Sequence, residues 1–265
     1  MIGVEVVRQR STVVRSQGSS PLKLLSPRRP GKAAWVYTST FGGGLVNGDD
    51  IRLDLSVGPG ATCCLTTQSA TKVYRSPNGR PARQELQARV SPGGVLVLAP
   101  DPVICFADAV YEQRQFVDVS GGGTLVVLDW ISSGRRGCGE CWAFRRYLNR
   151  LEIQYDGTRV LTDVLLLDPE DGPIDLPHRM GRFHCLAMLA AIGDRVAETN
   201  KSLLADVASK SVGRDDRLIE SASPIQGGVI VRMIGDTPER VGQRLLDRLE
   251  FTRAMLGTAP WERKW

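Results

Sequence analysis

The chain has 265 residues, of which 42% are hydrophobic and 24% charged, a globular composition that excludes intrinsic disorder. Its longest apolar stretch, residues 185–192, is far below the roughly 20 residues of a membrane span, and residues 1–11 lack the apolar core of a secretory signal. Its net charge is +5, with basic and acidic residues interleaved. We therefore expect a soluble cytoplasmic protein that binds neither membranes nor nucleic acid, with its six cysteines reduced.

Three segments in the first half of the chain carry the pattern of half-buried strands. Residues 51–57 alternate strictly between apolar and polar side chains, residues 86–90 repeat that pattern, and residues 111–119 follow it more loosely. The basic segment 19–32 contains three prolines, which favour a surface loop.

These strands belong to a repeated unit. Val57, Val90 and Val119, which are 33 and 29 residues apart, each precede a turn rich in glycine and proline, and each turn precedes an apolar strand, at 63–65, 95–99 and 125–130. A strand–turn–strand unit with this period is typical of stacked β coils. Alternatively, valines and glycine turns are simply common in all-β proteins.

The C-terminal part predicts two short helices. Asp194 is a candidate N-cap for a helix with Val196, Leu203, Leu204 and Val207 on one face. Asp236 or Thr237 begins a second helix, which has Pro238 in its first turn and ends at Gly257. No linker divides the chain. We therefore predict a mainly β protein with a stacked β-helical, solenoid-like body and two short helices in the C-terminal half, forming one domain over residues 1–265.

The glycine-rich segment 41–50 resembles a phosphate-binding loop only superficially. Such a loop needs a lysine after its last glycine, where this chain has Asp49 followed by Asp50, two charges that repel phosphate. Asn47-Gly48 instead favours a tight hairpin turn. The turn alone does not account for two carboxylates beside glycines that let another backbone approach.

Cys138 and Cys141 form a C-x-x-C motif. With His178 and His184, and with Cys185 beside the second histidine, they could make a zinc site or a thiol-dependent enzyme site. The glycines around the motif favour an irregular loop over the helix start that a redox dithiol requires. Incidental thiols in a turn remain a third interpretation.

Residues 65–76 combine hydroxyls, an amide and two cations with few large apolar side chains. This composition suits either a hydrated edge strand or a polar docking surface rich in hydrogen-bond donors.

Several of these segments together resemble the urease accessory proteins of the UreD family, also called UreH. The segments that carry the resemblance are 43–49, 65–75, 100–102 with Phe106, and 134–135 with 139–140. The first two, in this order and about 18 residues apart, are the most specific. The resemblance is strongest over residues 35–256, and residues 261–265 depart from the family pattern.

The resemblance implies a non-enzymatic scaffold that binds UreF and the GTPase UreG and docks on apo-urease for GTP-dependent nickel insertion. No cofactor is expected to be tightly bound, and nickel would be in transit through an internal water-filled route. The candidate carboxylates of that route are Asp49 and Glu140. The candidate route-lining or partner-binding residues are Thr66, Gln68, Lys72, Arg75 and Arg135. The alternative is a zinc- or thiol-dependent enzyme that uses Cys138, Cys141, His178 and His184.

Overall fold

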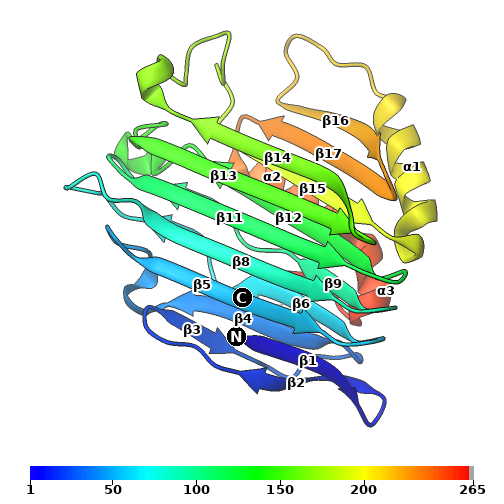
Figure 1. Ribbon diagram of the computed structural model, residues 1–265. Helices are drawn as coiled ribbons and strands as arrows, with labels where there is room; N and C mark the ends of the chain where they lie inside the picture. The colour runs from blue at the N-terminus through cyan, green and yellow to red at the C-terminus, as the bar shows by residue number, and fades with distance from the viewer. Residues whose placement is uncertain (263–265) are drawn as a thin grey trace.

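The computed structural model describes residues 1–262, so positions 263–265 of the atypical tail lie outside the described residues (Figure 1). Two β-sheets face each other, and all the α-helices lie behind the larger sheet (Figure 1). Within residues 1–262, every helix is too short or too polar to cross a bilayer.

The smaller sheet has seven strands. In order across the sheet they are β14 (Thr158–Leu167), β13 (Arg146–Tyr155), β11 (Val110–Val119), β8 (Ala82–Val90), β5 (Asp50–Val57), β1 (Ile2–Val7) and β2 (Arg10–Ser16). All neighbours from β13 to β1 are parallel, and the two edge strands are antiparallel to theirs.

The larger sheet has ten strands. Eight follow one path, in the order β16 (Leu218–Ile225), β17 (Gly228–Gly235), β15 (Cys185–Ile192), β12 (Thr124–Ser132), β9 (Val95–Leu98), β6 (Thr62–Thr67), β4 (Ala34–Thr40) and β3 (Leu22–Leu25). The short strands β7 (Thr71–Val73) and β10 (Val103–Cys105) pair with each other, and β10 also pairs with β12.

The chain builds the stack by alternating between the sheets. It passes from β5 to β6, from β8 to β9 and from β11 to β12, and each unit lies in parallel register on the one before. Val57 pairs with Val90, and Val90 with Val119. The repeat predicted from the valine spacing is thus confirmed, as is the mainly β, solenoid-like fold.

Two apolar cores result. One lies between the sheets, and the other lies between the larger sheet and helices α1 (Ala197–Ala208), α2 (Pro238–Leu249) and α3 (Arg253–Leu256). The predicted helices are confirmed, and the Thr237 side chain caps α2 by accepting a hydrogen bond from the Arg240 amide at 3.2 Å. The prediction that Asp194 caps the first helix is wrong. Asp194 instead begins a 3-10 turn (Asp194–Val196) that follows Gly193, and no side chain makes a capping hydrogen bond there.

Two further local predictions need correction. Segment 19–32 is not a simple surface loop, because its residues Leu22–Leu25 form the edge strand β3. Asn47-Gly48 does lie in a turn, closed by the Asp49 amide donating to the Val46 carbonyl, but the turn connects no hairpin. Leu45 instead bridges in parallel to Val73, while the strand after the turn, β5, pairs with β1 and β8.

The helix layer provides a stability test. Leu245 on α2 is completely buried against the larger sheet, so Leu245→Ala should lower the free energy of unfolding by about 2–5 kcal/mol. Gln243→Ala, at an exposed position on the same helix, should change it by less than about 0.5 kcal/mol. Urea unfolding of the three proteins measures both effects, and equal losses would contradict this packing.

Candidate functional site

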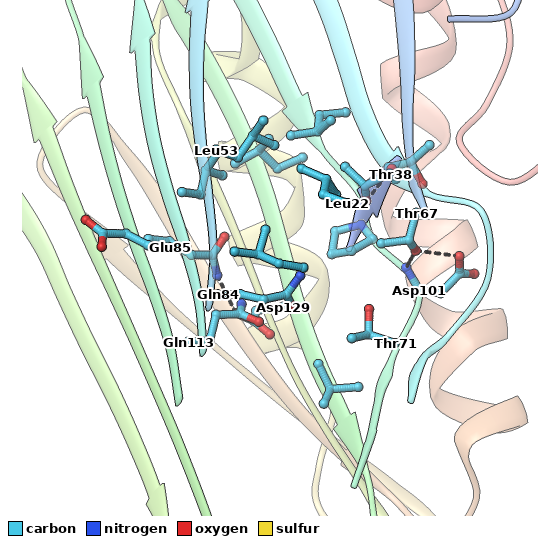
Figure 2. A pocket seen from close by; sticks show the side chains of 18 of the residues that line it. Leu22, Thr38, Leu53, Thr67, Thr71, Gln84, Glu85, Asp101, Gln113 and Asp129 are labelled. Carbon is cyan, nitrogen blue, oxygen red and sulfur yellow. Dashed lines mark hydrogen bonds between the residues drawn. The ribbon is translucent and has the colours of Figure 1, made fainter. Parts of the chain in front are cut away.

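A cavity lined by both apolar and polar side chains lies between the sheets. Its volume is about 110 Å³, which is room for water. Its polar lining gathers in two groups, as Figure 2 shows: Gln84, Gln113 and Asp129 on one side, and Thr67, Thr71 and Asp101 on the other. A second cavity, of about 280 Å³, also has Asp129 in its lining, together with residues of β14, β15, β16 and β17.

The parallel register aligns amide side chains on the inner face of the smaller sheet. Gln84 of β8 pairs with Gln113 of β11, and Gln113 pairs with Asn149 of β13. The Tyr111 hydroxyl lies 2.7 Å from Oε1 of Gln113 and also contacts the Gln84 amide oxygen. A row of neutral polar groups therefore crosses the buried face of the sheet.

Asp129 of β12 faces this row from the larger sheet. Its Oδ2 accepts hydrogen bonds from Gln113 at 2.9 Å, Gln115 at 2.6 Å and Asn149 at 2.8 Å. The residue is only 5% exposed, and burial raises the pKa of its carboxyl from 3.8 to about 7, although the amide hydrogen bonds act in the opposite direction. No cation pairs with it within residues 1–262.

The two ends of this polar region carry further carboxylates. At one end, Asp101 contacts Thr67, whose hydroxyl donates to Oδ2 at 2.7 Å. At the other end, Asp163 of β14 forms an ion pair with Arg232 of β17, and both residues line the second cavity. The linings of the two cavities thus include Asp101, Asp129 and Asp163, and Glu85 also borders the first cavity.

The donor set suits a hydrated cation better than a resident metal. Carboxylate, amide and hydroxyl oxygens are the groups that hard or hydrated divalent ions prefer. One buried acceptor, Oδ1 of Asn149, has no hydrogen-bond partner within the described chain. No group of three or more histidine, cysteine or acidic side chains in residues 1–262 could hold a metal ion.

The sequence candidates in residues 65–76 lie partly inside and partly on the surface. Thr66 borders the cavity, but its hydroxyl donates to the Ala99 carbonyl at 2.6 Å. Gln68, Lys72 and Arg75 are exposed. Thr66 lies in β6, which pairs with β4 on one side and β9 on the other, so this part of the segment is not an edge strand.

Asp49 and Glu140, the sequence candidates for the nickel route, do not line either of these two cavities. Asp49 accepts a hydrogen bond from the Val46 amide at 2.8 Å. Glu140 pairs with Arg135, which lowers the pKa of the Glu140 carboxyl, and accepts a bond from the Ala107 amide at 3.2 Å. The Arg135 guanidinium also lies over the Phe106 ring, 4.0 Å from its centre.

The cysteine and histidine candidates are only partly brought together. Sγ of Cys141 lies 3.4 Å from Nδ1 of His184, whose pKa is lowered by burial and by Arg136. Cys138 and His178 are exposed, and all six cysteines are free thiols. The contact is a pair rather than a complete set of zinc ligands.

Sequence reasoning missed the central residue of the cavity. Asp129 interrupts the apolar strand predicted at 125–130, and a carboxylate at an inward position of a buried strand is a signal that was available. Gln84 and Gln113 could not be recognised in the same way, because their alignment depends on the register between strands.

Comparisons with a family model and with individual proteins point to the same family. The family model described as "UreD urease accessory protein" matches residues 1–265. A urease accessory protein UreD from Sorangium cellulosum is 46% identical over 260 residues, covering 98% of this chain and 81% of its own. Urease accessory protein D from Arabidopsis thaliana is 34% identical over 289 aligned positions, covering 97% of each chain. A UreD protein from an Anaeromyxobacter species is 39% identical over 253 residues, covering 96% of this chain and 84% of its own.

The buried carboxylate predicts a pH dependence of stability. Between about pH 4 and pH 7, Asp129 holds a proton in the folded protein but loses it on unfolding, so its contribution to stability falls as pH rises. Asp129→Asn should remove this contribution and make the protein more stable above pH 7, by up to a few kcal/mol.

Urea unfolding across this pH range measures the difference between wild type and variant. Asp118→Asn, on the opposite face of the smaller sheet, should keep the wild-type dependence of the free energy of unfolding on pH. If Asp129→Asn showed the same pH dependence of stability as wild type, the attribution of that dependence to Asp129 would be contradicted.

Proposed function

This chain belongs to the UreD family of urease accessory proteins, and on that premise we propose that it is a non-catalytic scaffold for nickel insertion into urease. In this proposal it works in the cytoplasm, binds UreF and the GTPase UreG, and docks on apo-urease. The family match across the whole chain supports the proposal most directly.

The polar side chains that line the two cavities support the proposal of a route for nickel through the body of the protein. A divalent ion entering a partly desolvated passage loses stabilising water contacts, and fixed oxygen atoms with a negative charge offset that loss. Asp129 can supply the charge, and the unpartnered Oδ1 of Asn149 can accept a hydrogen bond from metal-bound water. Nickel is the cargo in this proposal, and the protein keeps no cofactor.

Transit also requires that the ion leaves. Thiolate and imidazole clusters hold transition metals tightly, whereas isolated carboxylates and neutral amides hold hydrated ions weakly. The polar region presents the second kind of group, spaced along its length. GTP hydrolysis would belong to UreG and urea hydrolysis to urease, so we propose no reaction for this chain.

The proposal is tested by reconstitution. Apo-urease, UreF, UreG, nickel and GTP should yield active urease only when this chain is included, and the chain should co-purify with UreF. Full activation without it, or no association with UreF and apo-urease, would contradict the scaffold role.

The route makes a specific prediction for Asp129. Asp129→Asn retains a side chain that can accept the amide hydrogen bonds but removes the charge, so urease activation should fall by about tenfold or more while the complex still assembles. Activity and co-purification are measured on the same sample. Normal activation by this variant would exclude a role for the charge, and Asp118→Asn serves as the matched control.

Asp49 and Glu140 can be tested in the same assay. We propose that both carboxylates contribute charge to the surface part of the nickel route. Asp49→Asn keeps an oxygen that can accept from the Val46 amide, and Glu140→Gln keeps one that can accept from Arg135, so both should preserve the local structure. Reduced activation with intact assembly is the expected result, and lost UreF binding would reassign the residue to docking.

A further inference from the structure

The loop at residues 41–49 presents apolar side chains to solvent. Phe41 is 59% exposed and Val46 is 51% exposed. Gly42 and Gly43, between them, have no atom within 4 Å of the position that a Cβ would occupy, so another chain can approach the backbone closely.

This loop is held in a fixed position by the strand beside it. The Leu45 amide donates to the Lys72 carbonyl at 2.8 Å, and the Tyr74 amide donates to the Leu45 carbonyl at 2.9 Å. Gly44 fits because a Cβ there would lie 2.6 Å from the Tyr74 ring. The Tyr74 ring in turn packs edge-on against Phe106, with the ring centres 5.2 Å apart. The exposed side chains therefore extend from an ordered support.

Four cationic side chains lie on segments that neighbour this loop. Lys72 and Arg75 flank Tyr74 on the adjacent segment. The Arg80 guanidinium lies about 3.5 Å from the position that a Gly48 Cβ would occupy, and the Arg145 guanidinium lies 3.3 Å from that of Gly79. Within residues 1–262 none of these four cations forms an ion pair, in contrast to Arg135, which is paired with Glu140.

The charge balance of this region is positive. Two nearby carboxylates lie outside ion pairs, namely Asp49, which accepts the Val46 amide, and Asp108, on the loop before β11. This region thus carries four cations and two carboxylates outside ion pairs, beside the exposed Phe41 and Val46. We name this surface the loop-41 face, defined by its apolar and cationic side chains: Phe41, Val46, Lys72, Arg75, Arg80 and Arg145.

We propose that the loop-41 face is the docking surface for an acidic segment of a partner protein, in which an apolar side chain covers Phe41 and Val46 and carboxylates meet the four cations. This inference rests on the proposed scaffold function and assigns one face to it. An apolar centre with a charged rim is the usual arrangement of protein interfaces, and unpaired rim charges favour a partner of opposite sign.

A nucleic acid is the less favoured occupant. Its phosphates would meet the cations, but binding of a single strand relies on several aromatic platforms in succession, and among the residues that define this face Phe41 alone is aromatic, while the nearby Phe106 is covered by Arg135 and by Tyr74. Val46, the other exposed apolar residue of the face, is a branched aliphatic residue that offers no stacking surface.

The test compares two charge-reversal variants of the full chain. Lys72→Glu with Arg80→Glu alters the loop-41 face, and Arg89→Glu with Arg114→Glu alters two exposed cations on the outer face of the smaller sheet. Phe41→Ser removes the apolar contact alone. Binding of each protein to UreF, to apo-urease and to a short single-stranded DNA is measured at low and high salt, and circular dichroism checks that each variant is folded.

We expect the loop-41 double variant to bind either UreF or apo-urease about tenfold or more weakly, with the Arg89 and Arg114 control within about twofold of wild type. Phe41→Ser should weaken binding of the same protein, and high salt should weaken binding by wild type more than by the loop-41 variant. The partner affected is then the one that carries the acidic segment.

Other outcomes contradict the inference in distinguishable ways. If wild type binds UreF or apo-urease and the loop-41 variant binds both with wild-type affinity, the docking surface is wrong while the scaffold function stands. If only DNA binding is lost in that variant, the face binds nucleic acid instead. If wild type binds neither protein, the proposed function fails, and the docking inference fails with it.

Discussion

Parallel strands stacked in register are the constraint on which the rest of this structure depends. When each unit lies directly on the previous one, side chains at equivalent inward positions form continuous rows across the sheet. The row through Val57, Val90 and Val119 is apolar and closes the core at one end. The row through Gln84 and Gln113 is polar and opens the cavity. The same geometry thus produces both the stable core and its interruption.

The interruption has an energetic cost that the fold has to offset. A carboxylate shielded from water loses solvation worth several kcal/mol, and three amide donors at Asp129 recover only part of it. An apolar residue at this position would pack without that cost. A group that destabilises the folded protein and lines two cavities is better explained by a function than by stability.

The sequence predicted features that depend on local spacing. The stacked units follow from the valine repeat, and α2 follows from its capping residues and helical periodicity. Strands β13 and β14 were not predicted, because neither shows a regular alternation of apolar and polar residues. In β13 the polar Asn149 occupies an inward position, and in β14 apolar residues occur on both faces. The cavity could not be predicted because it needs residues from both sheets in register.

The cavity and the loop-41 face differ in how firmly the backbone holds their side chains. Most of the polar side chains that line the cavity, such as Gln84, Gln113 and Asp129, come from extended strands, so they keep their spacing without a metal to hold them. The loop-41 face, by contrast, lies mostly on connections between strands, with Lys72 on the short strand β7, so an interacting chain can be accommodated with little disturbance of either sheet. In the nickel route that we propose, such a lining needs no closed ligand cage to keep its shape, and an open set of oxygens releases an ion faster than a cage does. The proposed route therefore favours transfer of the ion over its storage.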